Sequence, residues 1–165
     1  MEKEKITQEF TKGFNRSSKI MEFKLGVNEA RVLSALVYKH NYWLDVGKLT
    51  KIDEGQSFYI TLPNLVLETN LGEGVIKRCI NELQKSGLIE IIKKGLPAKN
   101  YFVLNKEAIE SFDSKYVGEY ENWSRKIYES ASEDRERFDN NKVSIENNCL
   151  SALIVPQLDQ NDLTS

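Results

Sequence analysis

The sequence predicts a mainly helical α+β fold that ends in a helical extension and a polar tail. Apolar residues recur three and four positions apart in successive segments between residues 28 and 86, as they do on the buried face of a helix. Two runs rich in β-branched and aromatic residues follow, and a short turn with glycine and proline separates them, which is typical of a β-hairpin. With 165 residues, 40% of them hydrophobic, the chain can build one core with appendages.

Residues 1–20 are polar and show no sustained periodicity, which favours a flexible N-terminal arm. Asn28 can cap a first helix that runs to about Trp43. The apolar positions of this helix are Val32, Leu33, Leu36 and Val37. A loop with turn residues continues to Gln56, and Ser57–Ile60 is typical of a short strand.

Two further helices are separated by a tight turn. Thr61 can cap the first of them, and Pro63 fits its first turn, where a missing amide hydrogen costs nothing. Asn70 tolerates the left-handed conformation that ends helices, so we expect the turn at residues 70–72. The next helix covers residues 73–86, and its apolar stripe consists of Ile76, Cys79, Ile80 and Leu83. Its opposite face carries Gly74, Lys77, Arg78, Asn81 and Lys85.

The hairpin that follows has a basic tip. Residues 88–92 and 100–104 predict its strands, and Gly95 and Pro97 shape the turn between them. Helix, strand, helix, tight turn, helix and hairpin, in this order, describe a winged helix-turn-helix, which we assign to residues 21–106. The third helix of that fold enters the major groove of DNA.

Charge is distributed unevenly along the chain. Residues 1–112 carry 17 Lys/Arg and 14 Asp/Glu, whereas residues 113–165 carry 6 and 11, for a net charge of -2. The basic excess is greatest in residues 72–106, which predicts double-stranded DNA as the partner of this part. Arginine can bind guanine and asparagine can bind adenine through paired hydrogen bonds, and lysine grips phosphates. The residues expected to contact DNA are Gly74, Lys77, Arg78, Asn81, Lys85, Lys93, Lys94, Lys99 and Asn100. A merely solvated helix face and a lysine turn that only aids solubility are the alternatives.

Two segments carry a resemblance to a known family. Thr61–Ile89 and Lys94–Tyr101 resemble the winged-helix N-terminal domain of phage and plasmid replication initiators, or replisome organisers, of low-GC Gram-positive bacteria. Asn28–Leu33 and Asn41–Trp43 extend the similarity to about half of the chain. Many regulators share the helix-turn-helix part, whereas the wing Gly95–Tyr101 points more narrowly to the replication family.

The chain departs from this family at three positions. Asn70 and Gly72 stand where the family usually has glycine and serine, and Gly74 stands where a longer polar side chain is usual. The resemblance implies a replication initiator that recognises a repeated origin site and recruits replication proteins through its C-terminal region. A transcriptional regulator with the same fold is the first alternative, and a protein-interaction module that no longer binds DNA is the second.

The C-terminal part combines an aromatic stripe with an acidic tail. Residues 107–131 predict an amphipathic helical extension, because apolar side chains recur along one face, namely Phe112, Tyr116, Tyr120, Trp123 and Ile127. This stripe can pack against the first helix of the domain, or Tyr116, Tyr120, Trp123 and Ile127 can form a homodimer interface. Residues 132–165 are acidic and rich in asparagine, which favours a largely disordered tail. Its apolar island, residues 149–155, could dock a partner.

Several function classes find no support in the sequence. Cys79 and Cys149 lack the spacing of a metal site or a disulfide framework, and His40, the single histidine, favours a structural role. A phosphate-binding loop, a dinucleotide-binding motif and a nucleophile elbow are all missing from the sequence, so we expect neither enzymatic activity nor a cofactor. Because no apolar run has the length of a signal sequence or membrane span, we expect a cytoplasmic protein.

Overall fold

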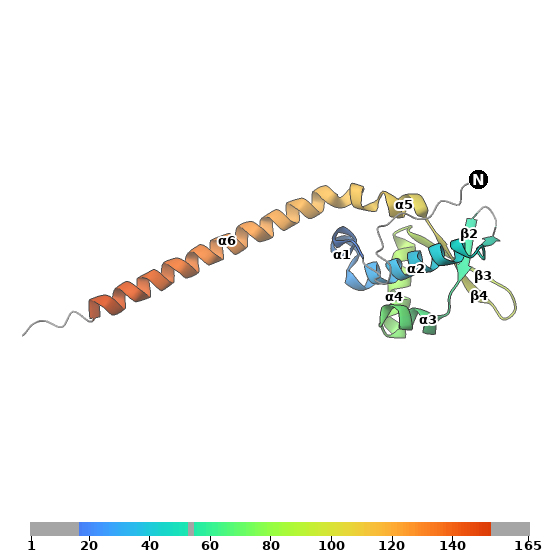
Figure 1. Cartoon of the computed structure of the whole chain (residues 1–165), viewed down its shortest axis with the longest axis horizontal. Helices are drawn as coiled ribbons and strands as arrows, with labels where there is room; N and C mark the ends of the chain where they lie inside the picture. Colours follow the sequence, from blue (N-terminus) through green and yellow to red (C-terminus); the bar gives the residue numbers. More distant parts are fainter. Residues whose placement is uncertain (1–16, 53–54, 153–165) are drawn as a thin grey trace, which may run out of the picture. The chain divides into compact units, whose positions relative to one another are not determined.

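A computed structural model describes residues 17–52 and 55–152 (Figure 1). The chain forms two compact units, residues 1–120 and residues 121–165. In chain order the elements are α1 (Lys19–Leu25), α2 (Val27–Asp45), β1 (Thr50–Ile52), β2 (Gly55–Tyr59), α3 (Leu62–Thr69), α4 (Glu73–Lys85), β3 (Ile89–Lys94), β4 (Lys99–Leu104), α5 (Lys106–Glu110) and α6 (Phe112–Ala152). This mainly helical set with one antiparallel sheet confirms the predicted fold class.

The N-terminal part of the first unit differs from the prediction. The Ser18 hydroxyl accepts a hydrogen bond from the Met21 amide and caps the start of α1. The prediction of a flexible arm over residues 1–20 is therefore wrong for its last residues. Residues 1–16 lie outside the described residues. Burial of Met21 in the core anchors this short helix. The cap of α2 is Gly26 and not Asn28, because the backbone turns from α1 into α2 at Gly26 with a φ of 104°.

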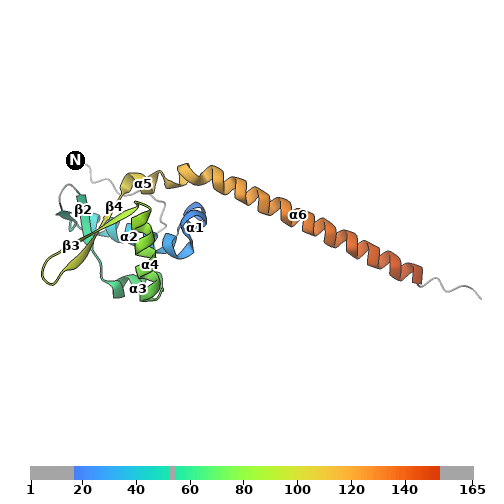
Figure 2. The same ribbon diagram turned by 180° about the vertical axis from the view of Figure 1, so that it is seen from behind.

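The helix-turn-helix follows the sequence prediction closely. The Thr61 hydroxyl accepts a hydrogen bond from the Asn64 amide at the start of α3, and Asn70 ends this helix in the left-handed conformation with a φ of 54°. The predicted apolar stripe of α4 is buried. Helices α3 and α4 both pack against α2 (Figures 1 and 2). The core between them includes Leu33, Leu36, Leu65, Ile76 and Leu83.

The sheet has the strand order β1-β2-β4-β3 and is antiparallel throughout. Its inner face contributes Phe58 and Phe102, whose ring centroids lie 6.0 Å apart. The predicted strand Ser57–Ile60 corresponds to β2, which begins earlier and ends at Tyr59. The sequence predicts a loop where the structure has β1, because three residues carry too little pattern to indicate a strand. The pairing of β1 with β2 is supported by the Ser57 hydroxyl, which donates a hydrogen bond to the Thr50 carbonyl.

The predicted boundaries after the hairpin are wrong. Ile109 and Phe112 are buried in the core of the first unit, so the domain does not end at residue 106. The predicted extension 107–131 is divided at Ser111 into α5 and α6. α6 then continues to Ala152, so the predicted disordered tail is wrong for residues 132–152. The sequence holds no glycine or proline between Gly118 and Pro156, which lets a polar helix continue. Residues 153–165, with the end of the apolar island, lie outside the described residues.

Candidate nucleic-acid interface

The residues predicted to contact DNA are all exposed, but α4 presents its share of them along two edges. Lys77 and Asn81 lie on the edge that faces the wing, the β3–β4 hairpin, whereas Arg78 lies on the edge that faces α2. Gly74 is exposed in the first turn of α4, with open space where a Cβ atom would be. The backbone of this turn is therefore accessible to a ligand.

A groove of about 450 Å³ separates α4 from the wing. Its floor is apolar, because Leu65, Ile80, Ile91 and Phe102 contribute to its lining. Its polar lining consists of Lys77, Asn81 and Gln84 from α4 and Lys93 and Asn100 from the wing. None of the described residues that line this groove is acidic. Lysines on two walls and three side-chain amides therefore offer hydrogen-bond donors to an anionic ligand.

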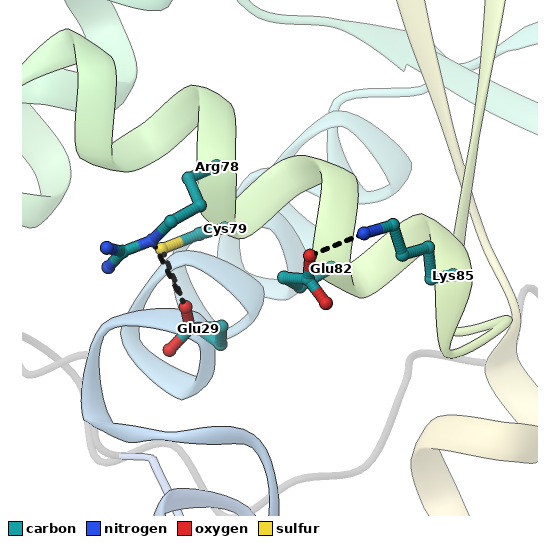
Figure 3. Close-up of polar contacts among 5 residues, drawn as sticks. All are labelled: Glu29, Arg78, Cys79, Glu82 and Lys85. Atoms are coloured by element: carbon teal, nitrogen blue, oxygen red, sulfur yellow. Dashed lines mark hydrogen bonds and ion pairs between the residues drawn. The ribbon is translucent and has the colours of Figure 1, made fainter.

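The opposite edge of α4 pairs its cations with carboxylates (Figure 3). Arg78 Nε lies 4.0 Å from Glu29 Oε1 of α2, and Lys85 Nζ lies 2.7 Å from Glu82 Oε1. On the edge that faces the wing, Lys77 Nζ lies 3.9 Å from Glu73 Oε2, and both side chains are mostly exposed. The pairs of Lys85 and Lys77 are exposed on both sides, and ion pairs of this kind contribute at most about 1 kcal/mol.

The wing divides its basic residues between the two faces of the hairpin. Lys93 is paired with Asn100 and Lys94 with Lys99 in the strand register. Because side chains alternate along a strand, Lys93 and Asn100 face the groove, whereas Lys94 and Lys99 lie on the other face. There, Lys99 Nζ lies 5.2 Å from the centre of the Tyr59 ring. The turn between the strands exposes Leu96 fully. The predicted basic tip is thus present.

Two residues of this region were not expected from the sequence. Gln84 belongs to the same edge of α4 as Lys77 and Asn81, and its helical spacing from Asn81 could have indicated this. Glu29 comes from α2, so no local pattern connects it with Arg78.

The aromatic stripe of the C-terminal part is divided. Tyr116 packs against Phe112, with ring centroids 4.7 Å apart, and Tyr120 meets Phe23 of α1 edge to face at 5.7 Å. These two tyrosines therefore pack inside the first unit, but the partner from another helix is α1 and not the helix predicted for residues 28–43. Trp123 and Ile127 belong to the second unit, where they are 46% and 51% exposed.

Two titratable side chains are buried near the helix-turn-helix core. Burial raises the pKa of the Cys79 thiol to about 11, and the hydrogen bond to Glu29 acts in the same direction. Burial also lowers the pKa of His40, whose ring packs edge to face on Phe58 at 5.9 Å, as a structural histidine would. Among residues 17–52 and 55–152 there is no cluster of three metal-ligating side chains. Within the same ranges no helix is long and apolar enough to span a membrane.

Comparison with known proteins supports the fold. No protein-family model and no curated protein matches the chain. A solved structure, the N-terminal domain of a DNA binding protein, is similar over 70% of this chain and 96% of that chain, with 18% sequence identity and a TM-score of 0.50. At this identity the similarity shows a shared fold, in agreement with the winged-helix architecture described above.

Proposed function

We propose that this chain binds duplex DNA through α4 and the wing, as a cytoplasmic replication initiator of the phage or plasmid type. The observation that carries the DNA-binding part is the groove between these elements, because Lys77 and Lys93 face it from opposite sides and no described lining residue is acidic. The similar solved structure is itself described as a DNA binding protein, which supports the same ligand class. The replication role is supported by the resemblance of the wing sequence Gly95–Tyr101 to initiators.

The proposal has two further parts. The second unit, residues 121–165, brings two copies together and provides the surface for other replication proteins. A transcriptional regulator would use the same DNA-contacting face, so the two roles differ in where the binding sites lie. Recovery of bound fragments from the host replicon separates them. Clustered repeats within an origin support initiation, and a single site at a promoter contradicts it.

Salt-dependent binding tests the DNA contact itself. Each phosphate that the protein neutralises contributes about −0.9 to the slope of log affinity against log salt. Lys77→Ala with Lys93→Ala should lower the affinity for every duplex and make this slope shallower. Lys48→Ala serves as a control, because Lys48 is exposed but does not line the groove. Undetectable binding at low salt, or equal effects of the double variant and of the Lys48→Ala control, would contradict the proposal.

A further inference from the structure

Glu29 and Arg78 come from different helices and meet beside the exposed face of α4. Arg78 Nε lies 4.0 Å from Glu29 Oε1, and Figure 3 shows the two terminal nitrogens of Arg78 directed away from the carboxylate. The Arg78 side chain is 62% exposed, whereas that of Glu29 is only 14% exposed. The pair therefore joins a nearly buried anion to a cation that reaches into solvent.

The Glu29 carboxylate is held by neighbours other than Arg78. Its Oε1 accepts a hydrogen bond from the Cys79 thiol, with Sγ 3.4 Å away. Glu29 lies in the first turn of α2, where the free amide groups of a helix favour a negative charge. Its Oε2 occupies the space beside Gly26, 2.5 Å from where a Cβ atom of that residue would be. Glu29 is thus held in place beside an arginine whose side chain is largely exposed to solvent.

We infer that Glu29 is a positioning residue for Arg78 and that it sets the preference of α4 for guanine at one base pair. This inference rests on the proposed function. A carboxylate beside Nε leaves the two terminal nitrogens available, and their parallel N–H groups match O6 and N7 of guanine. An arginine that is already directed loses less side-chain entropy when it binds.

The test compares base preference in full-length variants on a duplex that the wild-type chain selects. Glu29→Gln keeps the shape of the side chain and removes its charge. We expect the ratio of affinities for guanine over the other bases, at the position that Arg78 reads, to fall about three- to fivefold, the range of a partly exposed ion pair. Affinity for unrelated duplexes should stay equal or rise, because an anion near the phosphates is removed.

A matched control and a double substitution separate positioning from fold damage. Glu82→Gln removes the same charge from the same edge of α4, but its partner is Lys85, so the base ratio should not change. In an Arg78→Ala background, where the preference at this position is absent, Glu29→Gln should have no further effect. A wild-type ratio in Glu29→Gln, or an equal fall with and without Arg78, would overturn the inference.

A measurement without DNA distinguishes this inference from the proposed function. In nitrogen-15 spectra of the free full-length chain, the Arg78 Nε–H resonance should shift and exchange faster with water in Glu29→Gln, and should not change in Glu82→Gln. An unchanged resonance would overturn the inference even if DNA binds. A shifted resonance in a chain that binds no DNA would instead overturn the proposed function, and with it the base-reading role of the pair.

Discussion

Gly26 and Gly74 both lie at the start of a helix, but only Gly26 is required by the backbone. Gly26 has a φ of 104°, and Glu29 occupies the space that a Cβ atom would need. Gly26→Ala should therefore lower the free energy of unfolding by about 1–3 kcal/mol, the range for such backbone strain. Nothing lies within 4 Å of a Cβ atom at Gly74, so Gly74→Ala should raise it by about 0.5–1 kcal/mol.

Urea unfolding of both variants measures these effects. Equal destabilisation by the two changes would contradict the assignment of strain to Gly26. Gly74→Ala also tests the DNA contact, because the added methyl group would meet a DNA backbone that approaches the first turn of α4 closely.

The raised pKa of Cys79 predicts a dependence of stability on pH. The thiol has a pKa of about 11 in the folded chain against an ordinary value of 9.0, so folding favours its protonated form. Its contribution is complete below about pH 9 and disappears as the pH rises towards 11. In a Cys149→Ser background, the difference in unfolding free energy between Cys79 and Cys79→Ala chains should shrink over this window. A difference that is constant from pH 8 to 11 would contradict the shift.

At the scale of elements, the sequence predicts the helices and strands whose determining residues lie close together in the chain. α3 and α4 are predicted because Thr61, Asn70 and the apolar spacing of α4 act within a few residues of one another. The wing is predicted from the turn residues Gly95 and Pro97. The outward face of α4 follows from its apolar stripe, which places Lys77, Arg78 and Asn81 correctly on the surface without separating their two edges.

The elements that the sequence does not predict depend on distant contacts. α1 is too short to be stable alone and is held by contacts with the start of α6, where the Ser18 hydroxyl donates to Asp113 and Lys24 pairs with Glu119. β1 exists through its pairing with β2. The neighbours of Arg78 could not be predicted either, because Glu29 reaches it only after α2 and α4 have packed.

The wing as a whole should contribute affinity and not sequence preference. Lys93, Lys94 and Lys99 lie on both faces of the hairpin and can reach phosphates on either side of it. Their joint replacement by alanine should weaken binding similarly for all duplexes and make the salt slope shallower by about 0.9 for each phosphate that is no longer neutralised. The control replaces three exposed cations of α6, Arg125, Lys126 and Arg135, and so removes the same charge outside the wing. An unchanged slope in the wing variant would remove the wing from the interface.

At the scale of the whole molecule, α6 carries a row of apolar side chains on one face, which we expect to mediate self-association. Trp123, Ile127, Phe138 and Ile145 fall on the same side of this helix by their spacing, and all four are exposed in the single chain. Their spacing extends the predicted aromatic stripe well past Ile127. Two copies joined through this face could place two α4 helices at adjacent half-sites of DNA, which one domain cannot occupy alone.

Sedimentation of the full-length chain and of residues 1–120 tests this self-association. The cut belongs after Tyr120, because a cut after Leu104 would remove Ile109 and Phe112 from the core and unfold the domain. We expect a full-length dimer at tens of micromolar and a shortened monomer that binds DNA more weakly, since avidity is removed while the reading face stays intact. Ile127→Glu should give a full-length monomer, whereas Tyr128→Glu changes an exposed side chain outside the face and should leave the dimer. A full-length wild-type monomer would contradict the role of α6, and a monomer in both point variants would contradict the choice of face.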